Sequence, residues 1–132
     1  LMIVLLAAGL VFPCFTHAGS VDGSSPCLCA ITKVIECDSQ GECAEISTEA
    51  VNLPTFIRVD FQNKTLSGLD SANPRTTAIK NIEQGDGYMM LQGAENQRGW
   101  STMVTQETGK LSGSVTGEGY GFLLFGTCTV LP

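Results

Sequence analysis

The chain has 132 residues, a formal net charge of −6 from 13 acidic and 7 basic side chains, and 43% hydrophobic residues. This length supports one domain with a sizeable core and leaves no room for a second. An acidic chain is a poor partner for nucleic acid or for anionic lipid head groups, because both gain affinity from lysine and arginine.

The N-terminal segment is apolar and short. Residues 1–12 form an almost unbroken apolar run, and Ala18 supplies the small residue that signal peptidase requires. The run is shorter than the roughly 20 residues that cross a bilayer, so we expect a signal peptide over 1–18 and no stable membrane span. Acylation at Cys14 is the competing interpretation, which bulky Phe12 and Pro13 disfavour. The expected location is periplasmic or secreted.

Residues 19–26 are rich in glycine and serine and are expected to form a flexible linker before a single β domain over 27–132. The run 27–37 is typical of a strand with both faces partly covered. Turn residues at 38–41 allow 42–46 to return beside it. The strict alternation over 56–61 predicts a half-buried strand.

Later in the chain the turns become regular. Residues 69–75 resemble a loop, and β-prone runs then recur over 76–82, 88–92, 100–105, 110–116 and 120–128. Polar and glycine-rich turns separate these runs, which predicts an all-β antiparallel meander of about seven or eight strands. Because such a meander must hide its edge strands, we expect it to close into a small barrel, with a β-sandwich as the alternative.

Five of the six cysteines lie after residue 18. Cys37 and Cys43 flank a turn and can close a small loop, while Cys128 can pair with either Cys27 or Cys29 and join the first strand to the last. One cysteine is then left over. It is a buried thiol, an intermolecular link, or half of an exchange-active Cys27-x-Cys29 pair.

No catalytic template is present in the part of the chain after residue 18. His17 is the single histidine, so Ser-His-Asp and Cys-His arrangements are excluded there. The cysteine spacings do not match a zinc site. We therefore assign no catalytic residue, no metal and no cofactor.

The only tryptophan follows a loop rich in hydrogen-bonding side chains. Glu95, Asn96, Arg98 and Trp100 are the candidate ligand or partner surface, since an arginine beside an indole can form a stacking platform. The structural alternative is that Trp100 begins a strand and covers the core, with Val104 on the same face.

A resemblance covers nearly the whole chain after residue 18. Its motifs are Asn52-Leu-Pro-x-Phe, Gln92-Gly-x-Glu-Asn-x-Arg-Gly-Trp-Ser, Thr108-Gly-Lys-Leu, Gly119-Tyr-Gly-Phe and Phe125-Gly-Thr-Cys-Thr. In these motifs the chain resembles a family of small exported hypothetical proteins of Gram-negative bacteria. The resemblance implies a periplasmic protein of such a bacterium, and it carries no activity or ligand with it.

Three functions remain open. The first is a non-enzymatic binding or interaction module of the cell envelope, which uses the segment 95–100. The second is a carrier that holds a small apolar ligand inside the barrel. Its interior residues would be Ile57, Val59, Phe61, Met89, Leu91, Phe122 and Leu124. The third is a thiol–disulfide exchange protein.

Overall fold

The computed structural model describes residues 9, 20–70 and 74–132, and the expected signal segment lies outside them except for Gly9. The described chain contains ten strands and one short 3-10 helix. The elements are β1 (Cys27–Asp38), β2 (Cys43–Ile46), η1 (Glu49–Val51), β3 (Phe56–Asp60), β4 (Thr65–Gly68), β5 (Arg75–Ala78), β6 (Asn81–Gly85), β7 (Tyr88–Glu95), β8 (Arg98–Thr105), β9 (Lys110–Gly117) and β10 (Tyr120–Val130).

All of the strand pairs are antiparallel and belong to one sheet, in the order β5-β4-β3-β1-β10-β9-β8-β7-β6, with β2 paired to β1. The all-β antiparallel prediction is therefore confirmed. The expected strand count was too low by two, for two separate reasons. The short strand β4 went unrecognised, and the run 76–82, which reads as one strand, is divided into β5 and β6.

The division between β5 and β6 lies at Ile79 and Lys80. The Ile79 N–H donates to the Lys64 carbonyl at 2.8 Å, and the Lys80 N–H donates to the Gln92 carbonyl at 2.8 Å. Neighbouring residues thus bond to opposite parts of the sheet, because the chain passes here from one sheet edge to the other.

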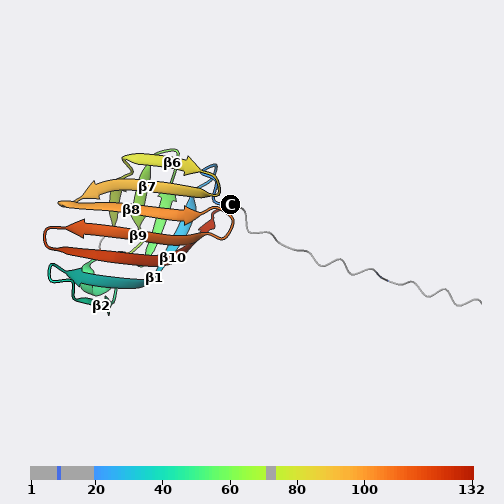
Figure 1. Cartoon of the computed structure of the whole chain (residues 1–132). Coiled ribbons are helices and arrows are strands. Elements are labelled where there is room, and N and C mark those ends of the chain that lie inside the picture. The colour runs from blue at the N-terminus through green and yellow to red at the C-terminus, as the bar shows by residue number, and fades with distance from the viewer. Residues whose placement is uncertain (1–8, 10–19, 71–73) are drawn as a thin grey trace, which may run out of the picture.

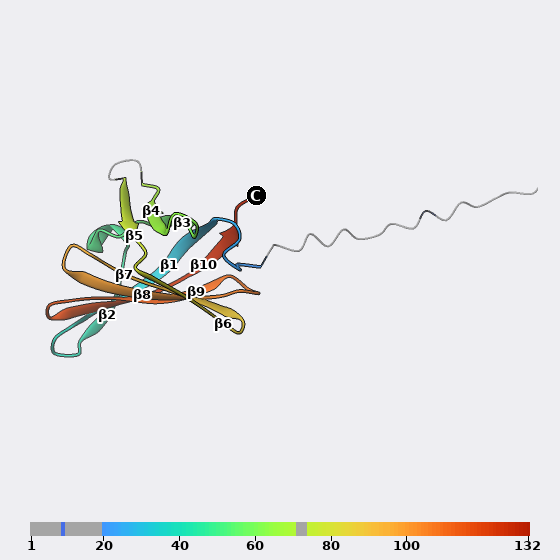
Figure 2. The same cartoon turned by 90° about the horizontal axis from the view of Figure 1, so that it is seen from above.

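The sheet curls into a half-barrel. In Figure 1 the strands from β6 to β10 lie side by side, and in Figure 2 the strands β3, β4 and β5 stand over that layer. The long strand β1 joins the two parts, because it pairs with β10 along Cys27–Asp38 on one side and with β3 through Cys27–Ala30 on the other. Its second half, Val34–Cys37, also pairs with β2. The register shifts between Ile31 and Lys33, where a bulge bends the strand. The two ends of the sheet order, β5 and β6, do not pair with each other in the described chain. The structure therefore shows a half-barrel, and the expected closed barrel is not confirmed.

The core lies inside the curl and is built from alternate residues of the strands. Its fully buried side chains include Leu91, Val34, Val104, Cys27 and Cys29. The segment expected to be a linker also contributes, because Val21 is buried and its N–H donates to the Gln106 carbonyl at 3.0 Å.

Two hairpins share a four-residue pattern. Residues 85–88 read Gly-Asp-Gly-Tyr and residues 117–120 read Gly-Glu-Gly-Tyr. In each, the first glycine pairs with the tyrosine, and the second glycine has a positive φ, 83° at Gly87 and 78° at Gly119. A Cβ on the first glycine would overlap the tyrosine ring, so the ring lies across a glycine in the neighbouring strand.

Candidate ligand-binding hollow

A hollow of about 100 Å³ lies between β3–β5 on one side and β7–β10 on the other. Its lining residues are Leu53, Pro54, Ile57, Leu66, Gly68, Arg75, Thr77, Glu95, Arg98, Trp100, Thr102, Val115 and Leu124. We call this space the hollow. It exists because the curl of the sheet brings β5 against β7, so that residues far apart in the sequence face one another.

The walls of the hollow are mainly apolar. Leu66 and Ile57 come from the strands above, and Val115 and Leu124 come from the layer below. Pro54 packs directly on the backbone of Gly68, because a Cβ at Gly68 would lie 3.0 Å from the Pro54 side chain. An apolar lining with a few polar groups is the usual composition of a small-molecule site.

Trp100 lies across Gly93, its direct partner in β7. A Cβ on Gly93 would lie 2.5 Å from Trp100 Cζ2 and 2.9 Å from the Ala78 carbonyl oxygen. The indole is half-buried and packs against the core, as the structural alternative expected, and it also lines the hollow. Its Nε1 is buried without a hydrogen-bond partner among the described residues.

Arg75 reaches the hollow from β5. Its Nη2 donates to the Asn52 carbonyl at 2.7 Å, which fixes the guanidinium group. Its Nη1 is buried and has no hydrogen-bond partner in the described part of the chain. Arg75 was not among the candidate residues, because no local pattern marks it: it follows a loop-like run, and the other residues of the hollow come from distant parts of the sheet.

Glu95 and Arg98 are direct partners at the end of the β7–β8 hairpin, and both line the hollow. The ion pairs within 4.0 Å in the described chain are Lys33–Glu45 and Arg58–Asp60, so Glu95 and Arg98 do not form one. Both hollow side chains thus keep their charges available to a third group.

Three of the four candidate surface residues, Glu95, Arg98 and Trp100, line the hollow. Asn96 does not, because it is exposed in the hairpin turn with a φ of 49°. It is a turn residue, since asparagine tolerates this left-handed conformation better than most residues do.

The residues expected inside a barrel are placed in the core. Val59, Phe61, Met89, Leu91, Phe122 and Leu124 are buried, and Ile57 is partly buried against them. Of this set, Ile57 and Leu124 line the hollow. The available space therefore lies at one end of the curled sheet.

The cysteines form two disulfides, Cys29–Cys128 and Cys37–Cys43, and Cys27 is free and buried. The register decides between the two candidates for Cys128, because Cys29 lies directly opposite it whereas Cys27 lies opposite Val130. Two disulfides indicate an oxidising, non-cytoplasmic environment.

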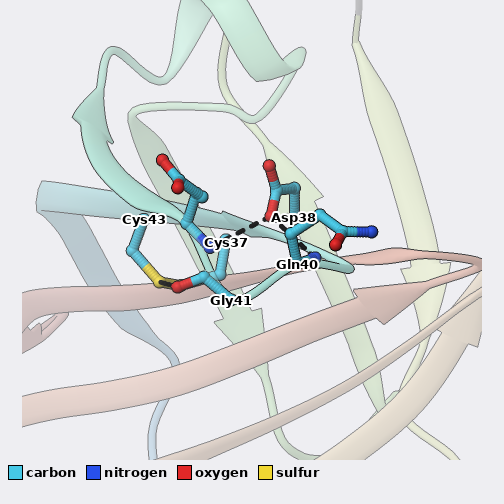
Figure 3. Close-up of a disulfide and its surroundings, with 6 residues drawn as sticks. Cys37, Asp38, Gln40, Gly41 and Cys43 are labelled. Atoms are coloured by element: carbon cyan, nitrogen blue, oxygen red, sulfur yellow. Dashed lines mark hydrogen bonds between the residues drawn. A yellow bond between two sulfur atoms is a disulfide. The ribbon is translucent and has the colours of Figure 1, made fainter.

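Figure 3 shows the small loop that the Cys37–Cys43 disulfide closes. Inside it, Asp38 Oδ1 accepts hydrogen bonds from the backbone N–H groups of Gln40, at 2.9 Å, and Glu42, at 3.0 Å. The aspartate satisfies backbone donors of the turn, as the turn chemistry at 38–41 predicts.

The Cys27 thiol is poorly suited to exchange chemistry. Its Sγ lies 3.9 Å from Cys29 Sγ, but burial raises the pKa of the Cys27 thiol to about 11. The reactive species is the thiolate, which burial disfavours. The Sγ atoms of Cys27, Cys29 and Cys128 lie within 4.8 Å of one another, but two of them share a disulfide and so are not thiolate ligands.

Within the described residues, no helix is long and apolar enough to cross a bilayer. Comparison of the chain with protein-family models, with curated proteins and with solved structures finds no match.

Proposed function

We propose that this chain is an exported, non-enzymatic binding protein of the cell envelope, which takes the apolar part of a small molecule into the hollow. The observation that carries the proposal is a mainly apolar space bordered by two buried polar atoms without partners, Arg75 Nη1 and Trp100 Nε1. A buried donor without a partner is costly, so a site that contains two of them favours a ligand that accepts hydrogen bonds.

The size of the hollow limits what enters it. An engineered apolar cavity of about 150 Å³ binds benzene, so a space of about 100 Å³ admits a short alkyl chain or most of one ring.

The other two candidate functions have less support. An interaction module would need the candidate residues of the segment 95–100 to point outwards, but Glu95, Arg98 and Trp100 line the hollow, and of the four candidates only Asn96 is exposed. Thiol exchange would need an accessible thiolate, and Cys27 is buried.

Titration with 1-hexanol and toluene tests the proposal. Trp100 is the only tryptophan and lines the hollow, so tryptophan fluorescence reports on the surroundings of this one residue. We expect a saturable change in emission, and ligand-detected NMR gives a second readout that does not depend on the indole.

The variant Thr102→Phe should weaken this binding, because it adds volume to a side chain that lines the hollow. The matched control is Met103→Phe, next in the same strand and 40% exposed on the opposite face. The proposal is contradicted if neither 1-hexanol nor toluene binds saturably. It is also contradicted if Thr102→Phe and Met103→Phe weaken the binding equally.

A further inference from the structure

The two unpartnered polar atoms at the hollow are both hydrogen-bond donors. A guanidinium group and an indole N–H donate and do not accept, so Arg75 Nη1 and Trp100 Nε1 cannot satisfy one another. What they lack is an acceptor. The described chain does not supply one, although Arg75 Nη2 has its acceptor in the Asn52 carbonyl.

The charges of the residues that line the hollow also favour an acceptor, and in particular an anion. Arg75 and Arg98 line it together with a single carboxylate, that of Glu95. The hollow therefore carries one net positive charge in a chain whose net charge is −6. Because Glu95 does not form an ion pair with Arg98, the carboxylate leaves both guanidinium groups open to a further anion.

We propose that the ligand is an amphipathic monocarboxylate, whose carboxylate is bound by Arg75 and Arg98 and whose apolar chain occupies the hollow. This inference rests on the proposed binding function. A planar guanidinium group matches the geometry of a carboxylate and forms charge-assisted hydrogen bonds to it. The indole N–H of Trp100 is a further unpartnered donor among the lining residues, and Leu66 and Leu124 supply apolar contacts for the chain.

The test compares hexanoate with hexanamide, which have the same alkyl chain and differ in head-group charge. We expect the wild-type protein to bind hexanoate at least about tenfold more tightly, as one charge-assisted contact would give. In Arg75→Gln and in Arg98→Gln the preference should fall to about threefold or less, while hexanamide binding changes little.

Arg58→Gln is the matched control, because Arg58 lies on β3 beside Ile57 but does not line the hollow. It should retain the wild-type preference for hexanoate. If it loses the preference as fully as the hollow variants do, the selectivity comes from general electrostatics and the inference is wrong.

Arg75 also holds the Asn52 carbonyl, so Arg75→Gln can disturb folding. If Arg75→Gln does not fold, two other variants test the inference. Arg75→Lys keeps the charge at this position, and Arg98→Gln leaves the contact between Arg75 and Asn52 intact. Equal binding of hexanoate and hexanamide would overturn the inference and leave the proposed function standing. Failure of both molecules and of 1-hexanol to bind would overturn the proposed function itself.

Discussion

Trp100 occupies the space that a side chain at position 93 would fill. The two residues are direct partners in β8 and β7, and a Cβ on Gly93 would lie 2.5 Å from the indole ring. The shape of the hollow thus depends on a missing side chain as much as on the tryptophan that lines it.

Gly93→Ala should displace the indole and destabilise the fold. We expect a loss of about 1–3 kcal/mol in the free energy of unfolding, the usual cost of overpacking, together with a shift in Trp100 emission. Urea unfolding and fluorescence measure the two effects. Gly99→Ala is the control, because a Cβ there would meet no atom closer than Thr116 Oγ1 at 3.9 Å. Equal effects of the two substitutions would show that Gly93 has no special role.

The two disulfides should contribute unequally to stability. Cys29–Cys128 spans 99 residues and Cys37–Cys43 spans 6. On the chain-entropy model their removal costs about 4.7 and about 2 kcal/mol respectively. Denaturant unfolding of Cys29→Ala/Cys128→Ala and of Cys37→Ala/Cys43→Ala, each against wild type, gives the comparison. A larger loss from the small-loop pair would contradict the chain-entropy account of the two disulfides.

Native Cys27 should resist alkylation. Burial raises the pKa of its thiol from 9.0 to about 11, so at pH 8 the thiolate fraction falls about a hundredfold, and burial also blocks access. Iodoacetamide labelling followed by mass spectrometry measures the rate, with the same protein in urea as the control. Rapid labelling of the folded protein would reopen thiol exchange as a function.

Asp60 should make stability depend on acid. Hydrogen bonds from the backbone and side chain of Asn63, assisted by Arg58, hold the pKa of the Asp60 carboxyl below its usual 3.8. The folded pKa is therefore the lower one, and the stabilisation is present above 3.8 and is lost as the pH falls through the folded value.

The measurement for Asp60 is the difference in unfolding free energy between wild type and Asp60→Asn as a function of pH. Wild type should be the more stable protein at neutral pH, with a constant advantage down to about pH 5 and a shrinking one below it. If the difference in unfolding free energy does not change with pH, the ionisation of Asp60 does not contribute to stability and the prediction is wrong.

Much of the fold was predictable because local patterns determine it. The turn residues at 38–41 predict both the first hairpin and the Cys37–Cys43 disulfide, and the glycine turns predict the later hairpins. The pattern could not choose between Cys27 and Cys29, because the two lie on the same face of one strand and only the register with β10 separates them.

The hollow was only partly predictable. Arg98 and Trp100 are adjacent on one strand face, so their sequence spacing brings them together. Arg75 joins them through the curl of the sheet, which depends on the bulge after Ile31 and on the crossing at Ile79 and Lys80. Such long-range geometry leaves no signal in the residues around Arg75 itself.

The most direct test of the binding site is isotope-filtered NMR of the protein with bound hexanoate. Leu124 and Leu123 are adjacent in β10, but Leu124 lines the hollow whereas Leu123 is 46% exposed on the outer face. We predict intermolecular contacts from the alkyl chain to the methyl groups of Leu66 and Leu124, and from the protons beside the carboxylate to the Trp100 indole. Contacts to Leu123 instead, or none to the hollow, would contradict the assignment of this site.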